Sequence, residues 1–206
     1  MRLTVIGASG GTGTEVTRQA LEAGHEVVAV VRDPSKMLVP GAKVFRAAIT
    51  NPDDLAPAMR DSDAVVSALG PRSGEPTGIL VQGAKSTLTA MGETGVKRIV
   101  VVSASGFFVE EGEGLLVGKI AKPILRRVLR DNATDTREME SLVSASDTEW
   151  TIMRPSQLTN GPRRANYKTA VDRYAGARTS RANLADAILK ALSDPDTIRH
   201  RIDVAN

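Results

Sequence analysis

The stretch Gly7-Ala8-Ser9-Gly10-Gly11-Thr12-Gly13 decides the fold of this chain. It closes a short apolar run, Leu3–Gly7, and leads into a segment with a helical pattern, Thr12–Ala23. Four glycines so close to a helix start need a reason, because glycine loses more conformational freedom on folding than any other residue. We interpret the spacing as a tight strand-to-helix turn whose backbone must approach a ligand closely.

Each glycine of this turn has its own predicted task. Gly7 permits the sharp exit from the strand, and Gly13 lets the helix lie close to the sheet. Gly10 and Gly11 remove β-carbons where a pyrophosphate would approach the backbone. Unpaired N–H groups and the helix dipole attract phosphates to such a helix start. We therefore predict a dinucleotide site, in preference to a structural turn without a ligand. Its cofactor contacts would come from backbone amides of the turn and from the hydroxyls of Ser9 and Thr12. The predicted cofactor-binding residues of the turn are Gly7, Ser9, Gly10, Gly11, Thr12 and Gly13.

Apolar runs of strand length alternate with longer helical patterns along the chain. The predicted strands are Leu3–Gly7, Glu26–Val31, Lys43–Ala48, Ala64–Leu69, Arg98–Ser103, Glu149–Arg154 and, at the sheet edge, Arg201–Val204. The predicted helices are Thr12–Ala23, Asp53–Arg60, Thr77–Thr94, Leu115–Leu129, Ala133–Ala145 and Ser180–Ser193. Such alternation implies parallel strands joined by right-handed crossovers. We predict a Rossmann-type, doubly wound α/β/α fold, formed as one domain over residues 1–206, with the substrate cleft in its C-terminal loops and helices.

The residue after the second predicted strand distinguishes the two nicotinamide dinucleotides. An NAD site usually has Asp or Glu there, because a carboxylate can hold both ribose hydroxyls. Here Val30-Val31 is followed by Arg32, whose guanidinium can pair with a 2′-phosphate and stack on adenine. Asp33 comes next, but its place before Pro34 is better explained as a helix N-cap. The sequence therefore favours NADP(H) over NAD(H) as the cofactor.

Composition narrows the class of protein. The 206 residues are 41% hydrophobic, which is enough for one core without a metal or disulfide staple, and cysteine is absent. A net charge of +3 with only 3% aromatic residues gives no platform for stacking nucleic-acid bases. No stretch approaches the ~20 apolar residues that span a bilayer, and the first apolar run ends too soon for a signal peptide. We expect a cytoplasmic monomer or weak dimer that binds a small-molecule substrate but no metal, nucleic acid or membrane.

Four segments together carry a family resemblance: the glycine turn, Arg32-Asp33-Pro34, Val96–Ser105 and Trp150–Pro155. With them the chain resembles the atypical short-chain dehydrogenase/reductases that have an NAD(P)-binding, NmrA-like domain. Within that group it is most similar to the flavin reductases of the biliverdin-IXβ reductase type. The similarity covers nearly the whole chain, and its nucleotide-binding motifs are more specific than those of the substrate half.

This resemblance implies roles for residues beyond the glycine turn. Ala68-Leu69-Gly70, after the fourth predicted strand, would pass beside the cofactor ribose. Ser103-Ala104-Ser105, after the fifth, would face the nicotinamide, and Ser105 would match the active-site serine of the family. Pro155 would border the nicotinamide pocket.

The chain also departs from the family pattern at three places. Short-chain dehydrogenases usually carry Tyr-x-x-x-Lys soon after the serine strand, where the lysine lowers the pKa of the tyrosine. The tyrosines here, Tyr167 and Tyr174, both follow the sixth predicted strand, and neither has a lysine four residues on. The acid often found near adenine is replaced by Ala47-Ala48-Ile49-Thr50, and the histidine of the biliverdin-type enzymes by Ser156-Gln157-Leu158. The missing Tyr/Lys pair argues against ordinary alcohol–ketone chemistry but fits a flavin reductase.

Other candidate groups are interpreted as structural. His25 and His200 lie in a turn and near the C-terminus, so neither is placed as the base of a serine triad. Glu138 and Glu140 fall on a polar helical segment and are expected at the surface, not as a catalytic carboxylate pair. The basic segment Leu115–Leu129 is expected to form a lid or a packing helix rather than a membrane helix.

Two functions from different classes fit these residues. The leading hypothesis is an NADPH-dependent oxidoreductase that delivers hydride to a planar acceptor, such as a flavin, quinone or tetrapyrrole, whose own heteroatoms are protonated by solvent. Phe107, Phe108 and Leu115 would line its apolar slot, and Ser105 would orient the nicotinamide or the substrate. The alternative is a non-catalytic NADP(H)-binding regulator of the NmrA-like kind. A sugar-nucleotide epimerase relative is a third reading, for which a larger C-terminal substrate region would be needed.

Overall fold

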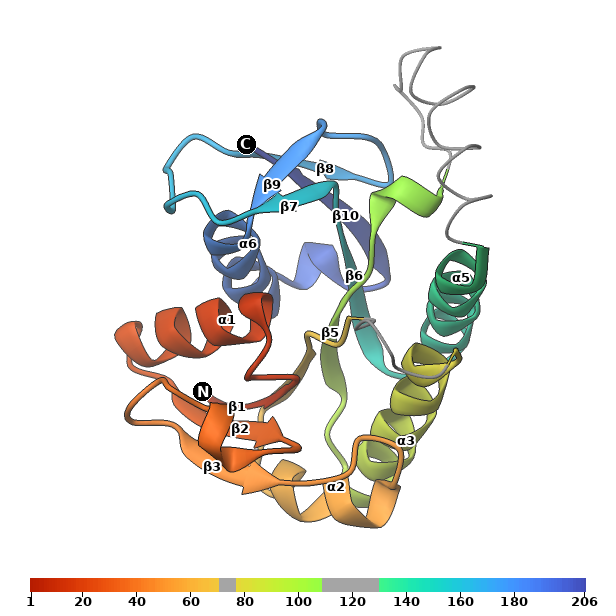
Figure 1. Ribbon diagram of the computed structural model, residues 1–206. Coiled ribbons are helices and arrows are strands. Elements are labelled where there is room, and N and C mark those ends of the chain that lie inside the picture. Colours follow the sequence, from red (N-terminus) through yellow and green to blue (C-terminus); the bar gives the residue numbers. More distant parts are fainter. Residues whose placement is uncertain (71–76, 109–129) are drawn as a thin grey trace.

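A computed structural model describes residues 1–70, 77–108 and 130–206 (Figure 1). Its eight-stranded sheet has the order β3-β2-β1-β4-β5-β6-β10-β8 and is parallel except for the last pair. The strands are β1 Arg2–Ile6, β2 Glu26–Val31, β3 Lys43–Arg46, β4 Ala64–Ser67, β5 Arg98–Val102, β6 Glu149–Pro155, β8 Lys168–Val171 and β10 His200–Ala205. The α-helices are α1 Gly11–Glu22, α2 Pro52–Met59, α3 Ile79–Thr94, α5 Arg130–Ser144 and α6 Arg181–Ser193. A separate two-stranded sheet pairs β7 Gln157–Thr159 with β9 Arg178–Ser180. The predicted doubly wound Rossmann-type fold is therefore confirmed.

Local chemistry explains where several elements begin and end. Asp33 caps the short 3-10 helix Pro34–Lys36, because its side chain accepts a hydrogen bond from Ser35 N, as predicted. Gly95 ends α3 in the left-handed conformation, with φ of 78°. Asn51 caps α2 by accepting from the amide of Asp53. These caps fix the crossovers that carry the chain from one parallel strand to the next.

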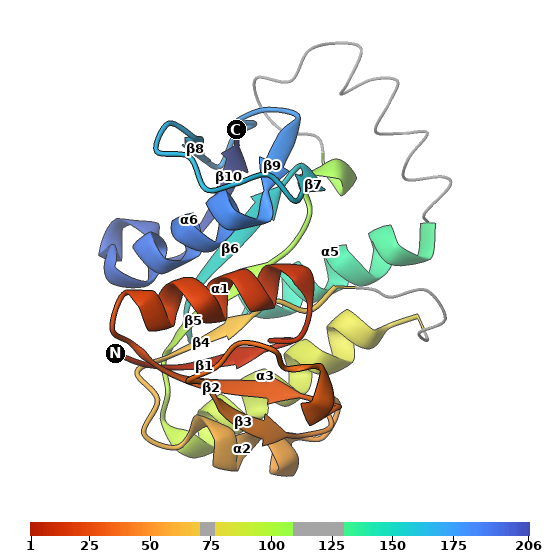
Figure 2. The ribbon, with the colours of Figure 1, turned by 60° about the vertical axis from the view of Figure 1, so that its left-hand side comes forward.

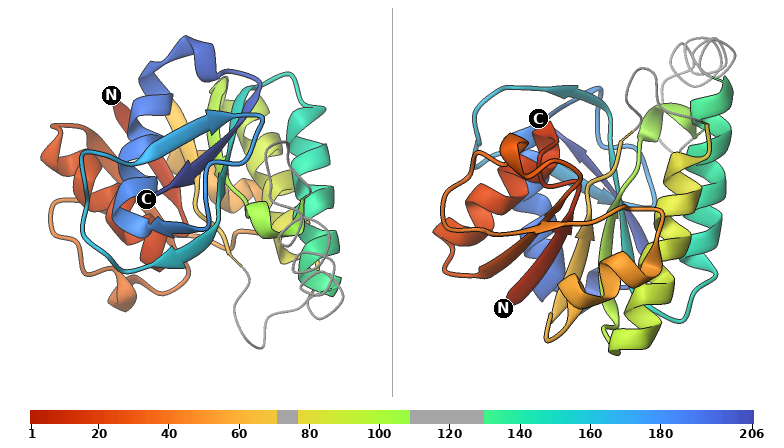
Figure 3. Two further views of the ribbon diagram at one scale, coloured as in Figure 1. Left: turned by 90° about the horizontal axis from the view of Figure 1, so that it is seen from above. Right: turned by 60° about the horizontal axis from the view of Figure 1, so that its bottom comes forward.

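Two hydrophobic cores lie on the two faces of the sheet. Along β5, Val100 and Val102 face the core beneath α1 and α6, whereas Ile99 and Val101 face the core beneath α2, α3 and α5. This alternation is what a strand buried on both faces requires. Figure 2 shows α1 and α6 side by side over one face, and the right-hand view of Figure 3 shows the sheet between the two helical layers.

One expectation about the sheet is wrong. The last strand, predicted as Arg201–Val204 at the sheet edge, is β10, and it lies between β6 and β8. Its far side pairs antiparallel with β8, in a register that places Ile202 opposite Val171. The exposed β8 was not predicted, and neither was the small sheet of β7 and β9. The chain after β6 thus adds one antiparallel strand to the main sheet and forms a small second sheet.

Two predicted segments, the loop 71–76 and the basic helix Leu115–Leu129, lie outside the described residues, as does the rest of 109–129. Glu110, Glu111, Glu113 and Leu115 fall among them. Within the described ranges, no helix is both long and apolar enough to cross a bilayer.

Candidate functional site

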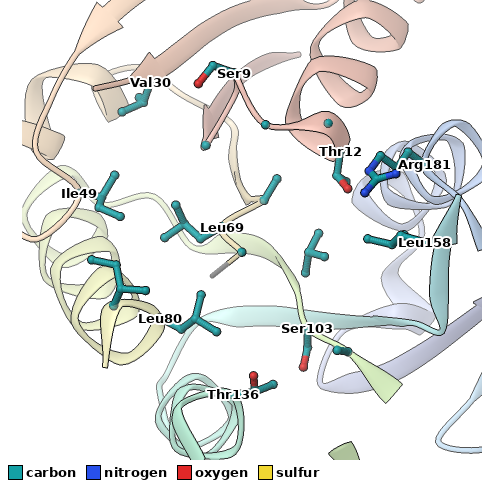
Figure 4. Close-up of a pocket in the computed structure, with 18 of the residues that line it drawn as sticks. Ser9, Thr12, Val30, Ile49, Leu69, Leu80, Ser103, Thr136, Leu158 and Arg181 are labelled. Carbon is teal, nitrogen blue, oxygen red and sulfur yellow. The ribbon is translucent and has the colours of Figure 1, made fainter. Parts of the chain in front are cut away.

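The strand order reverses between β1 and β4, and a cleft opens there at the carboxyl edge of the sheet. This is the place where open α/β sheets bind ligands. The cleft has a volume of about 470 Å³ and is shown in Figure 4. The predicted site residues that line it are Gly7, Ser9, Gly10, Gly11, Thr12, Arg32, Ala68, Leu69, Gly70, Ser103 and Ala104. The structure therefore brings together most of the cofactor-binding set predicted from the sequence.

The glycine turn is built by close backbone approaches. Gly7 has φ of +75°, and a β-carbon on it would lie 2.9 Å from the carbonyl oxygen of Ala68. A β-carbon on Gly13 would lie 2.2 Å from the carbonyl oxygen of Gly7 and 2.8 Å from Cα of Ala8. Such distances leave no room for any side chain at Gly13. The first turn of α1 can therefore rest against the end of β1 only because these positions lack side chains.

The start of α1 has features that suit an anion. Its N-cap is Gly10, no described side chain caps this end, and its first turn contains no acidic residue. By contrast, α6 is capped by Ser180, whose hydroxyl accepts from the amide of Asn183. The first N–H groups of any α-helix have no intrahelical acceptor. Amides at the α1 start thus face the cleft beside Thr12, as a diphosphate cradle requires.

A basic side chain that the sequence reasoning missed lies over this turn. Arg181 is the first residue of α6 and lines the cleft beside Thr12 and Leu158 (Figure 4). A β-carbon on Gly11 would meet its Nε at 2.7 Å. Gly11 therefore makes room for Arg181, a role that could not be foreseen because the two residues are far apart in the chain.

Arg32, which directly follows β2, lies where the cleft adjoins a second hollow. This hollow, of about 620 Å³, shares Arg32 with the cleft and is also lined by Arg46, Asp53 and Asp54. Asp54 Oδ2 accepts a hydrogen bond from the amide of Ala48 at 3.2 Å. The carboxylates near this end thus come from α2, where the sequence reasoning, which looked for an acid at the end of β3, did not seek them.

The opposite end of the cleft is lined by the hydroxyls of Ser103 and Thr136, which already donate their protons to other protein atoms. Ser103 Oγ donates to Glu140 Oε1 at 2.5 Å, and Thr136 Oγ1 donates to the carbonyl of Asn132 at 2.7 Å. Figure 4 shows Ser103 and Thr136 close together at this end. Phe107 lines it as well, as predicted. A hydroxyl that donates its only proton elsewhere can offer a ligand only its lone pairs.

Gly13, Ser105 and Pro155 belong to the predicted set but are not among the residues that line the cleft. Ser105 is 1% exposed and lies in the 3-10 helix Ser105–Phe107. Its Oγ is 3.0 Å from that of Ser156, which donates to the carbonyl of Gly176. Because Ser156 has one proton, Ser105 is the donor of this pair. A direct role for Ser105 stays a prediction.

Glu140 is not at the surface, which corrects the expectation for it. Its side chain is 3% exposed and accepts from Arg154 at both oxygens, at 3.0 Å and 2.6 Å. Arg201 Nε lies 3.4 Å from Oε2. Glu138, two residues earlier, is exposed as expected. Glu140 thus anchors the strands β6 and β10, and it holds Ser103 at the cleft.

The described tyrosine nearest to a lysine lies away from this cleft. Tyr167 Oη donates to Asp186 Oδ2 at 2.7 Å and accepts from Lys190 Nζ at 3.1 Å. Burial and the hydrogen bond to Asp186 raise the pKa of Tyr167, although Lys190 opposes this. A tyrosine used as an acid or base needs the opposite shift. Tyr167 is not among the residues that line the cleft.

Comparison with known proteins places the chain among nucleotide-binding relatives. A model of the family described as NAD(P)H-binding matches residues 7–195. The uncharacterised protein YwnB of Bacillus subtilis is 25% identical over 217 residues, covering 100% of this chain and 99% of YwnB. YhfK of the same organism, named as an uncharacterised sugar epimerase, is 26% identical over 217 residues, covering 99% of this chain and 94% of YhfK. The solved structure of a candidate NADH-flavin reductase from Streptococcus pneumoniae has a TM-score of 0.83 at 22% identity, covering 100% of this chain and 99% of that chain, which is a likeness of fold.

Proposed function

The chain belongs to the NAD(P)H-binding family, and from this premise we propose that it is an NADPH-dependent oxidoreductase acting on a small planar acceptor such as a flavin, quinone or tetrapyrrole. The reduced cofactor, when bound, would supply the hydride. The glycine turn and Thr12 would hold its diphosphate, and Arg32 its 2′-phosphate. Ser103 would accept a hydrogen bond from the carboxamide at the far end of the cleft.

The observation that carries this proposal is that the described residues at that far end offer no proton donor. Among the described lining residues there is no His, Tyr, Lys, Asp or Glu, and the hydroxyls of Ser103 and Thr136 donate to other protein atoms. Reduction of a ketone needs a proton delivered to its oxygen in step with the hydride. A flavin or quinone can instead take its protons from solvent. The lining therefore favours such an acceptor, held by Phe107 and Leu158.

The test is turnover with a panel of acceptors. Purified protein is mixed with NADPH and a flavin, a quinone or a simple ketone, and the absorbance of the nicotinamide band is followed. We expect oxidation of NADPH with at least one flavin or quinone and none with the ketone. Turnover with the ketone alone would refute the proposal, because it would require a proton donor at the cleft.

A non-catalytic NADP(H) regulator is the second candidate, since the same lining without an acid or base would suit it. Binding of NADPH without oxidation by any acceptor of the panel would favour this candidate. The epimerase reading, suggested by the name of YhfK, is less well supported. Epimerisation of a sugar alcohol also needs a base at the reacting carbon, which the described lining lacks.

The choice between NADPH and NADH depends on Arg32. Arg32→Asp replaces a cation by an anion where the 2′-phosphate would bind, so we expect NADPH affinity to fall about a hundredfold. NADH affinity should change by less than about threefold, because NADH has only a hydroxyl at that position. Calorimetric titration of both cofactors measures the two effects. Lys36→Gln, which changes an exposed cation that follows Arg32 in the chain and does not line the cleft, serves as the control. Equal losses for both cofactors would contradict the assignment of Arg32.

A further inference from the structure

Arg181 occupies an unusual position at the cleft. It is the first residue of α6, and its side chain crosses to α1, where Gly11 leaves space for it. Its Nη1 donates to Asn160 Oδ1 at 2.6 Å, which fixes the guanidinium beside the first turn of α1. Figure 4 shows the guanidinium next to Thr12. The starts of α1 and α6 therefore meet at this point, with a cation between them.

This arrangement is electrostatically unfavourable without an anion. The N-terminus of a helix carries a partial positive charge, so a cation in the first turn of α6 is repelled by its own helix. The start of α1 adds a second positive helix end, and its first turn has no acidic residue. Among the residues that the structure describes, no carboxylate lies within ion-pair distance of Arg181. Arg18 of α1 differs, because it pairs with Glu15 and Glu22.

The geometry leaves the guanidinium able to bind an anion in the cleft. Arginine has five N–H donors, and the hydrogen bond to Asn160 uses one of them. Arginine forks match phosphate oxygens in a bidentate way. The diphosphate proposed to lie on the α1 amides is the anion closest to this position.

We propose that Arg181 is a second anchor for the diphosphate of NAD(P)H, facing the glycine turn from α6. This inference rests on the proposed binding of the dinucleotide at the turn. The α1 amides hold the diphosphate on one side, and Arg181, positioned by Asn160, holds it on the other. The absence of a side chain at Gly11 serves to admit Arg181. Because NADPH and NADH share the diphosphate, Arg181 contributes equally to the binding of both.

The test is Arg181→Gln in the full chain, titrated by calorimetry with NADPH and with NADH. We expect the affinities for both to fall about tenfold to a hundredfold and by the same factor, because a charge-assisted hydrogen bond is lost. The Arg32→Asp variant should behave differently by discriminating the two cofactors. Arg178→Gln, an exposed arginine three residues earlier that does not line the cleft, should leave both affinities unchanged.

Stability without cofactor separates an anchor from a structural residue. An arginine that opposes the helix dipole gives the apo-protein little stability, so Arg181→Gln should leave its Tm unchanged or slightly higher. A lower Tm with unchanged affinities would show a structural role and overturn the proposal.

The contact between Gly11 and Arg181 allows a double-mutant cycle. Gly11 has an ordinary helical backbone, so Gly11→Ala should fold, but its methyl group must displace the guanidinium. We expect it to weaken the binding of both cofactors about threefold to tenfold in the wild type and much less in Arg181→Ala, which has no side-chain atoms where the methyl group would meet Arg181. Additive losses would overturn the placement of Arg181 at the diphosphate. If the wild type binds NADPH and Arg181→Gln binds it equally well, only this inference fails; if the wild type binds neither cofactor, the proposed function fails first.

Discussion

Gly13→Ala is expected to lower the free energy of unfolding by about 3 kcal/mol and to weaken NADPH binding by about a hundredfold or more. The added β-carbon would lie 2.2 Å from the carbonyl oxygen of Gly7 and 2.8 Å from Cα of Ala8. Both neighbours are backbone atoms, so no side-chain rotation can relieve the contact. The start of α1 must therefore move away from β1. That movement loosens the packing of Val16 and Ala20 and displaces the amides that face the cleft.

Urea unfolding measures the stability loss, and calorimetry measures the binding loss. Gly92→Ala is the matched control, because Gly92 lies within α3 and a β-carbon there would meet nothing within 4 Å. This control should raise the free energy of unfolding by about 0.5–1 kcal/mol, the usual gain for alanine over glycine in a helix. If Gly13→Ala were as stable as Gly92→Ala, this would contradict the close packing of the first turn of α1 against the end of β1.

Glu140→Ala is expected to lower the free energy of unfolding by about 3–5 kcal/mol. The cost arises because Arg154, which forms a two-point contact with Glu140, would keep its charge in a largely buried place and lose both of these hydrogen bonds. Arg201 and the hydroxyl of Ser103 would lose an acceptor as well. Removing one partner of a buried ion pair costs much more than the pair contributes as a whole.

Three further variants separate these contributions. Glu138→Ala changes an exposed glutamate on the same helix and should stay within about 0.5 kcal/mol of wild type. Ser103→Ala removes one hydrogen bond and should cost about 1 kcal/mol. Glu140→Gln keeps the size of the side chain but not its charge, so it should fall between Glu138→Ala and Glu140→Ala. A Glu140→Ala protein as stable as Glu138→Ala would contradict the buried network.

The fold could be predicted because its signals are local. The glycine turn follows an apolar run and precedes a helical pattern, and continuous runs such as Val27–Val31 and Ile99–Val102 indicate strands buried on both faces. Strand β8 carries no such signal, since only one of its residues is even partly buried. Without it, β10 looks like an edge strand. The position of β10 inside the sheet therefore could not be inferred from its own residues.

The sequence predicted the part of the candidate site that lies at the ends of recognisable strands. It did not predict the contacts between residues far apart in the chain. The turn and Arg32 lie at the ends of β1 and β2, so the sequence places them directly. Arg181 reaches the same cleft from a helix that starts about 170 residues after Gly11. Glu140 looked exposed because its segment is polar, but its partners come from β6 and β10. In each case the decisive contact is made by tertiary packing.

The most direct test of the central claim is a calorimetric titration of the wild-type protein with NADPH and, separately, with NADH. The claim is that the diphosphate of the cofactor rests on the bare amides of the turn that begins α1. We expect one NADPH to bind per chain, more tightly than NADH, and both to bind much more weakly to Gly13→Ala. Absence of binding by either cofactor to the folded wild-type protein would contradict the account.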